Sequence, residues 1–126
     1  MNKQTKVSAL LLLLVTALFL SACDSNAQRI ETSKRAWEMI DAGALVIDVR
    51  TAKEYKKGHM DNVLNIPYEN TAALIKAIGS DKSRPVVLYC RSGGRAGVAQ
   101  VQLAKAGYTN VFNGLGLRDM QAARPD

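Results

Sequence analysis

Residues 85–99 read PVVLYCRSGGRAGVA, and this stretch decides how the rest of the chain is interpreted. Residues 86–89 are apolar, favour β-structure and follow a proline, which predicts a short strand buried on both faces. From residue 98 to 106 the apolar positions recur at close to helical spacing, and Gly107 offers a C-terminal stop. A thiol, two arginines, a serine and two adjacent glycines therefore lie between a strand and a helix.

Residues 91–96 have the composition of an anion-binding loop. Gly93 and Gly94 allow a tight turn in which successive N–H groups face one point, and the following helix adds the positive end of its dipole. Because this environment stabilises a thiolate, we expect Cys90 to ionise more readily than free cysteine and to be a nucleophile. A buried structural cysteine is the alternative, but it would have no use for the flanking glycines and arginines.

The loop Cys90-Arg91-Ser92-Gly93-Gly94-Arg95 has the pattern C-x-x-G-x-R, and three further segments accompany it. They are Leu45-Val46-Ile47-Asp48-Val49-Arg50 with Glu54 and Tyr55, then Gly58-His59-Met60 with Asn65-Ile66-Pro67, and finally Gly107-Tyr108 through Asn113-Gly114 to Leu117-Arg118. In this order the four segments resemble the rhodanese, or thiosulfate sulfurtransferase, family. The resemblance begins near residue 30 and implies an α/β fold, a central parallel sheet with helices on both faces. Alternating strands and helices along the chain favour the same architecture.

The resemblance also implies roles for individual residues. Cys90 would carry the transferred sulfur, while the backbone of residues 91–96 and the side chains of Arg91 or Arg95 would bind the anionic donor. Arg95 is favoured because it occupies the family's arginine position. Serine is common at the position of Ala96, so this chain lacks one hydroxyl donor near the sulfur.

Asp48-Val49-Arg50 closes a predicted buried strand over residues 44–49, at the kind of edge where α/β proteins bind ligands. By the resemblance, Arg50 lies near the pocket and can contact the anion, with Asp48 in support, holding loop donors or a basic side chain. A structural ion pair between the two residues is the alternative.

The implied reaction is ping-pong sulfur transfer from thiosulfate or a similar donor, through a persulfide on Cys90, to cyanide or a thiol. One alternative is a phosphatase or arsenate reductase, but related phosphatases have the longer loop C-x5-R, whereas arginine here stands at the fifth position after cysteine. Another alternative is a persulfide carrier or sensing module for a membrane-associated partner. The sequence implies no metal or organic cofactor, since His59 is the only histidine and no nucleotide-binding loop is present.

Residues 1–22 are predicted to be a lipoprotein signal peptide. Lys3 and Lys6 precede an apolar stretch over residues 7–20, which is shorter than the roughly 20 residues that span a bilayer. Leu20-Ser21-Ala22-Cys23 resembles the lipobox of bacterial lipoproteins, so Cys23 is expected to carry diacylglycerol and to tether the protein to the membrane. The alternative is an ordinary signal peptide cleaved near Ala22 or Ala27.

This leader implies that the protein resides in the bacterial cell envelope, with its domain in the periplasm. By analogy with lipoprotein sorting, Asp24 favours the inner membrane. Residues 23–29 are then a polar tether and residues 30–126 the rhodanese-like domain, beginning with a helix for which Ser33 is a plausible N-cap. If lipid occupies the sulfur of Cys23, Cys90 has no disulfide partner in the chain.

The composition fits one globular domain, with 126 residues of which 48% are hydrophobic. There are 17 basic and 11 acidic residues, a net charge of +6, and loss of the two leader lysines would leave +4. The basic residues are scattered and are not interleaved with aromatic residues, which argues against nucleic-acid binding. The expected partners are instead a small anionic sulfur donor, a thiol or cyanide acceptor and, through Cys23, a membrane.

Overall fold

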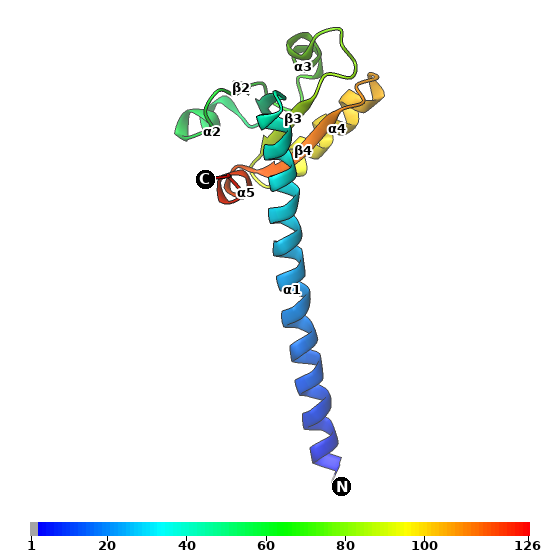
Figure 1. Cartoon of the computed structure of the whole chain (residues 1–126). Helices are drawn as coiled ribbons and strands as arrows, with labels where there is room; N and C mark the ends of the chain where they lie inside the picture. Colours follow the sequence, from blue (N-terminus) through cyan, green and yellow to red (C-terminus); the bar gives the residue numbers. More distant parts are fainter. Residues whose placement is uncertain (1–2) are drawn as a thin grey trace.

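The computed structural model describes the backbone of residues 3–126 and the side chains of residues 7–9, 11, 12 and 25–126. In this part of the chain a parallel sheet has four strands: β1 (Leu45–Asp48), β2 (Leu64–Asn65), β3 (Val86–Cys90) and β4 (Val111–Gly116). Their order is β2-β1-β3-β4, with Leu45 opposite Val86 and Val86 opposite Val111. In Figure 1, β3 and β4 lie next to each other. The predicted α/β fold with a central parallel sheet is therefore confirmed.

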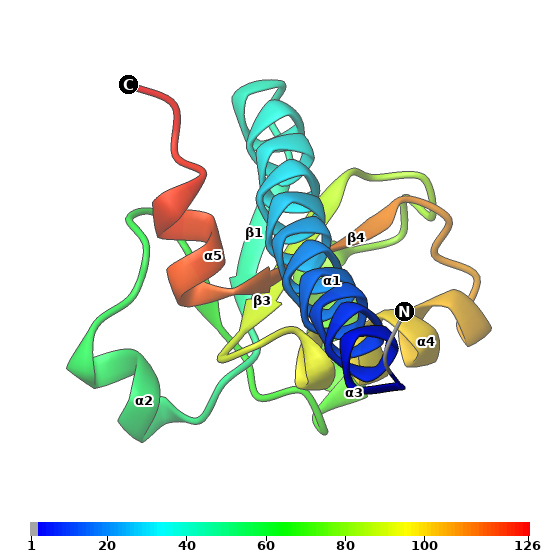
Figure 2. The same cartoon turned by 90° about the horizontal axis from the view of Figure 1, so that it is seen from below.

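Helices cover both faces of the sheet. The helices α3 (Thr71–Ile78) and α4 (Gly94–Lys105) pack on one face, where Val86, Leu88 and Cys90 point. On the opposite face, Val87 and Tyr89 join a second apolar cluster with α1 (Lys3–Asp41) and α5 (Leu117–Ala122), which lie side by side in Figure 2. The alternation of side chains along β3 thus places Cys90 on the α4 face.

The short helix α2 (Ala52–Lys57) follows β1 and begins with a capping box. Thr51 accepts a hydrogen bond from the N–H of Glu54, and the Glu54 carboxylate accepts one from the N–H of Thr51. These two bonds satisfy backbone donors that a helix start otherwise leaves without a partner. They also fix the position of Glu54, whose carboxylate accepts hydrogen bonds from Arg95 in the first turn of α4.

The first helix begins earlier than the sequence predicts. A start capped by Ser33 is wrong, since α1 is continuous from Lys3 to Asp41 and the Ser33 hydroxyl donates to the carbonyl of Gly114 in β4 at 2.9 Å. Residues 23–29, predicted to be a tether, are helical here, and the side chain of Cys23 lies outside the described residues. Among the described residues, no helix is both long and apolar enough to cross a membrane.

Two boundaries near the site also differ from the predicted ones. The helix expected from residue 98 begins at Gly94. The start that the sequence predicts is too late because the glycines of the first turn carry no apolar signal that indicates a helix. The sequence also predicts a last strand over residues 109–112, whereas β4 runs from Val111 to Gly116. The connection between β3 and α4 is therefore only residues 91–93, which places the start of α4 directly beside Cys90.

Candidate active site

Cys90 ends β3 at the carboxyl edge of the sheet, beside β1. From these two central strands the chain continues in opposite directions, from β1 outward to β2 and from β3 outward to β4. Open α/β sheets bind ligands at such a point. Cys90 is a free cysteine with 1% of its surface exposed, and its Sγ atom accepts a hydrogen bond from the N–H of Gly93 at 3.0 Å. The structure thus brings the predicted nucleophile and one predicted backbone donor together.

Gly93 carries the turn that makes this contact. Its φ of +105° is a conformation that side chains rarely adopt, and a Cβ atom there would lie 3.1 Å from the side chain of Leu115. The carbonyl of Gly93 accepts a hydrogen bond from Asn113 at 2.9 Å. Gly94 instead begins α4, whose first N–H groups and positive dipole end face the carboxyl edge. Ala96 is buried in the same cluster as Cys90.

The two arginines of the loop have different environments. Both terminal nitrogens of Arg95 donate to the two carboxylate oxygens of Glu54, each at 2.8 Å. This bidentate pair joins α4 to α2 and holds the pKa of the Glu54 carboxyl well below its usual range. Arg91 is exposed and lines a cleft of about 420 Å³ with Arg50 and Lys57.

Asp48 and Arg50 form a buried pair at the end of β1. The Asp48 carboxylate accepts bonds from Arg50 Nε at 3.0 Å and from Arg50 Nη2 at 2.6 Å, and Nη2 also donates to the carbonyl of Gly58 at 2.7 Å. The structure places Asp48 as the residue that holds a basic side chain. Arg50 reaches the cleft, but most of its hydrogen-bonding capacity is directed into the protein.

His59 lies away from the sulfur. Its ring stacks on Tyr55 at 3.7 Å between centroids, and Nδ1 lies 2.8 Å from the Tyr55 carbonyl at the end of α2. The following residue, Met60, donates its N–H to the hydroxyl of Tyr89, whose pKa is raised mainly by burial. Among the described residues, no group of three or more histidine, cysteine or carboxylate side chains is placed to hold a metal ion.

Three residues that hold the loop were not predicted to do so: Arg29, Asn113 and Asp119. Arg29 Nη2 donates to the carbonyl of Ser92 at 3.0 Å and to Asp119 at 2.6 Å. Nothing in the local sequence around these residues signals the contact, because each partner is at least 20 positions away. Glu54 belongs to the family-like segment that begins at Leu45, and its spacing from Thr51 is that of a capping box. This spacing does not reveal that Arg95 is its partner.

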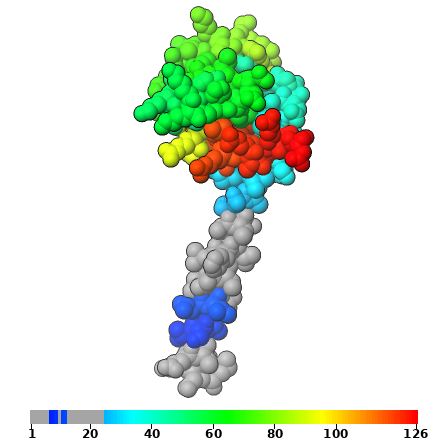
Figure 3. Space-filling view, turned by 90° about the vertical axis from the view of Figure 1, so that its left-hand side faces the viewer, coloured from blue at the N-terminus to red at the C-terminus, as the bar shows by residue number. Residues whose placement is uncertain are grey.

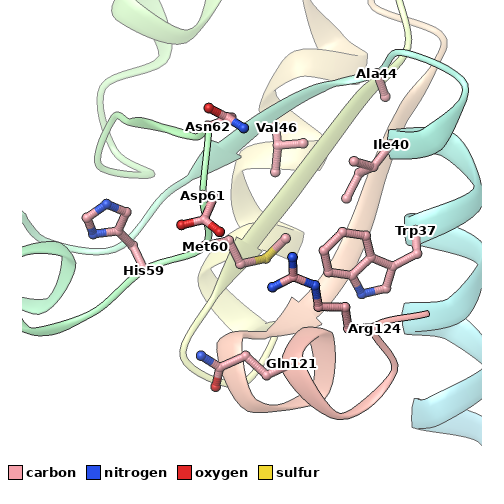
Figure 4. Close-up of a pocket in the computed structure, with 10 residues that line it drawn as sticks. All are labelled: Trp37, Ile40, Ala44, Val46, His59, Met60, Asp61, Asn62, Gln121 and Arg124. Carbon is pink, nitrogen blue, oxygen red and sulfur yellow. The ribbon is translucent and has the colours of Figure 1, made fainter. Parts of the chain in front are cut away.

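A second cavity of about 420 Å³ lies on the α1 and α5 face (Figure 4). Trp37, Val46 and Met60 provide apolar walls, and Asp61 and Arg124 are polar groups at its rim. Trp37 is partly buried, packs against the core cluster on this face and donates its indole N–H to the carbonyl of Met120. Because Cys90 faces α4 on the other side of the sheet, this cavity is not part of the site around the sulfur.

Known proteins resemble this chain in sequence and in fold. The sequence model of the rhodanese-like domain family matches residues 32–116 of this chain. The thiosulfate sulfurtransferase PspE of Escherichia coli is 36% identical over 74 residues, which cover 59% of this chain and 71% of that protein. A tRNA uridine(34) hydroxylase of Erwinia tasmaniensis is 32% identical over 77 residues, which cover 58% of this chain but 22% of that longer protein.

Among solved structures, one described as a rhodanese with anions from E. coli has a TM-score of 0.57 and 35% sequence identity. The match covers 61% of this chain and 91% of that one. The matched family segment includes β1 to β4 and the entire loop around Cys90. With its parallel sheet, its cysteine at the carboxyl end of β3 and this extent of similarity, the chain belongs to the rhodanese-like domain family.

Proposed function

We propose that this protein is a sulfurtransferase that moves a sulfane sulfur from thiosulfate or a similar anion to a thiol or cyanide. The observation that carries the proposal is the contact between the N–H of Gly93 and Cys90 Sγ at the carboxyl end of β3. A fixed backbone donor at the sulfur stabilises negative charge there without having to reorient during the reaction. The same donor serves the thiolate and, by a small adjustment, the persulfide that replaces it.

The reaction has two steps. In the first, the Cys90 thiolate attacks the outer sulfur of thiosulfate, a new S–S bond forms, and the old S–S bond breaks with its electron pair leaving on sulfite. In the second, cyanide or an acceptor thiolate attacks the terminal sulfur of the persulfide and restores the Cys90 thiolate. No external oxidant is needed, because in each step one bond to the transferred sulfur replaces another. No general base is needed either, because the attacking thiolate or cyanide is already an anion.

Arg91 and Lys57 are proposed to bind the oxygen atoms of the donor. The fork of Arg95 is filled by Glu54, whereas Arg91 is exposed and lines the cleft that Lys57 and Arg50 also line. A planar guanidinium suits an oxyanion, and a nearby ammonium adds charge. This proposal moves the substrate contact from Arg95, which the family pattern favoured, to Arg91.

Intact-mass spectrometry tests the central claim. After incubation with thiosulfate, the protein should gain about 32 Da, the mass of one sulfur atom, and cyanide should remove it with release of thiocyanate. A Cys90→Ser variant should show neither change while keeping its fold. A mass gain that survives in Cys90→Ser would show that the sulfur is carried elsewhere.

Turnover separates this function from the alternatives. Repeated thiocyanate formation from each protein molecule is expected of an enzyme, whereas a carrier or sensing module would gain one sulfur and release it slowly without a partner. Hydrolysis of an aryl phosphate without thiocyanate formation would instead favour a phosphatase. The short loop between β3 and α4 supports sulfur transfer over phosphate hydrolysis, and turnover separates the enzyme from the carrier.

We also propose that Cys23 is lipidated and that the domain lies on the periplasmic side of a bacterial membrane. By analogy with lipoprotein sorting, Asp24 favours the inner membrane. The support is the apolar leader followed by Leu20-Ser21-Ala22-Cys23. Labelling cells with a fatty-acid analogue should mark the wild-type protein but not a Cys23→Ser variant. Equal labelling of the two proteins, or labelling of neither, would contradict lipidation at this residue.

A further inference from the structure

The peptide group between Ser92 and Gly93 is held from both ends. Its carbonyl oxygen accepts a hydrogen bond from Arg29 Nη2 at 3.0 Å, and its N–H donates to Cys90 Sγ at 3.0 Å. Because a peptide group is planar and its C=O and N–H point in opposite directions, fixing the oxygen fixes the direction of the N–H. Arg29 therefore acts on the sulfur through a single rigid unit.

Arg29 is itself fixed by α5. Its Nε and Nη2 atoms donate to the two carboxylate oxygens of Asp119 at 3.1 and 2.6 Å. Asp119 also accepts the N–H of Gly116 at 2.9 Å. Although burial opposes ionisation of Asp119, the bonds from Arg29 and Gly116 hold the pKa of its carboxyl below the usual value, so the pair is charged at neutral pH.

This arrangement joins three segments that are far apart in the sequence. Ser92 is 63 positions from Arg29, and Asp119 is 90 positions from it. In Figure 3 the surface of α5 (orange to red) lies directly above that of α1 (light blue), and the yellow surface of the segment that includes the start of α4 lies beside α5. Arg29 and Asp119 both fall outside residues 32–116, the segment that matches the rhodanese-like family.

We propose that Arg29 is a positioning residue for sulfur transfer, which aims and polarises the Ser92–Gly93 peptide so that its N–H stabilises the anionic sulfur of Cys90. The inference rests on the proposed sulfurtransferase function and adds a residue from α1 to the site. A cation bound to the carbonyl oxygen withdraws electron density from the peptide, and this makes the N–H a stronger donor. Arg29 does not need to touch the substrate to have this effect.

The charges around the sulfur agree with this role. The pKa of Arg29 is raised mainly by its hydrogen bond and charge interaction with Asp119, and that of Arg95 by those with Glu54. A thiolate at Cys90 would add to both shifts. Two cations from different helices thus lie within electrostatic reach of Cys90, each held in place by its own carboxylate. Arg95 acts from the start of α4, whereas Arg29 acts through the loop carbonyl.

Steady-state kinetics on the full chain tests the proposal. With thiosulfate and cyanide, Arg29→Ala should lower kcat about tenfold and leave KM for thiosulfate within about twofold, because the lost interaction is with the sulfur anion rather than the donor. Arg29→Lys should recover part of the loss, since an ammonium still donates to the Ser92 carbonyl. Arg35→Ala, which removes an exposed arginine of the same helix, should match the wild type.

A second measurement does not depend on sulfur transfer. The rate at which iodoacetamide alkylates Cys90 should reach half its maximum at a higher pH in Arg29→Ala than in the wild type or in Arg35→Ala. If the wild type forms neither persulfide nor thiocyanate, the proposed function fails, but this shift would still support the role of Arg29 at the sulfur. An unchanged alkylation profile in a folded Arg29→Ala protein, or a loss that Arg29→Lys does not reduce, would overturn the proposal.

Discussion

Two neighbouring strand ends at the carboxyl edge of the sheet are held in different ways. At the end of β1, Arg50 bonds to residues two and eight positions away, Asp48 and Gly58. At the end of β3, the loop after Cys90 is held through Ser92 and Gly93 by residues 63 and 20 positions away. The Arg50 side chain is thus held by residues close to it in sequence, whereas the loop after Cys90 is held by residues distant in sequence.

The difference separates a structural role from a chemical one. The buried pair of Asp48 and Arg50 forms between groups close together in sequence, and Asn65 donates to both of their carbonyls. The loop after Cys90 has only three residues before α4, and the contacts that hold its carbonyl groups come from α1 and β4. Substitutions at the β1 end should therefore lower stability, whereas substitutions around β3 should lower activity more than stability.

The largest loss of stability is expected from Arg50→Ala. It would leave the carboxylate of Asp48, which is 0% exposed, without its cationic partner. We expect the free energy of unfolding to fall by about 3 kcal/mol, measured by urea denaturation. Arg118→Ala, which removes an exposed arginine from α5, should change it by less than about 0.5 kcal/mol. A similar, small effect of both substitutions would show that the β1 end does not need its ion pair.

Gly93→Ala should lower both the stability of the fold and the rate of sulfur transfer. The positive φ and the contact of the new Cβ with Leu115 should cost about 1–3 kcal/mol, and displacement of the N–H from Cys90 Sγ should lower kcat about a hundredfold. Gly94→Ala is the matched control for stability, because a Cβ there meets open space. Equal unfolding curves for the two variants would contradict the strain assigned to Gly93.

Glu54→Gln should have a smaller, pH-dependent effect. Removing the charge that pairs with Arg95 should lower the stability by about 1 kcal/mol at pH 7. Because the pKa of Glu54 is lowered in the folded protein, only the unfolded state takes up its proton as the pH first falls below about 4.5. The advantage of the wild type should thus be complete above about pH 5 and shrink at more acid pH. A gap that stays constant down to pH 2.5 would exclude Glu54 as its source.

Arg91→Ala should change stability least, by less than about 0.5 kcal/mol, since the side chain is exposed. Its effect should appear in KM for thiosulfate, which we expect to rise about tenfold through loss of the donor contact. Lys105→Ala, at the far end of α4, removes the same charge and should leave KM unchanged. Should both variants raise KM equally, the overall charge of the domain rather than Arg91 would attract the donor.

The sequence predicts the parts of the fold whose signals are local. The buried strand before Cys90 and the glycines of the loop each lie within a few residues of the feature they specify. The parallel sheet follows from the alternation of such elements together with the resemblance to the family. Cys90 as nucleophile stays a prediction, supported by its place at the end of β3.

Contacts across the domain could not be predicted in this way. The sequence suggests Arg95 as the donor's partner but contains no sign that Glu54, on α2, fills its guanidinium fork. Arg29 was assigned to a polar tether because residues 23–29 lack apolar periodicity, yet Arg29 contacts α5 and the loop. Each of these pairs depends on how helices pack on the sheet, which a single sequence does not specify.

The near-complete cover over Cys90 has a consequence for selectivity. With 1% of the residue exposed, bulky protein thiols and larger oxidants have little access to Sγ, which limits mixed disulfides. A persulfide, as in the proposed reaction, would extend the side chain by one S–S bond, about 2 Å. An acceptor would then meet the outer sulfur atom while the inner one stays shielded, which would favour delivery of sulfur over cross-linking of the protein.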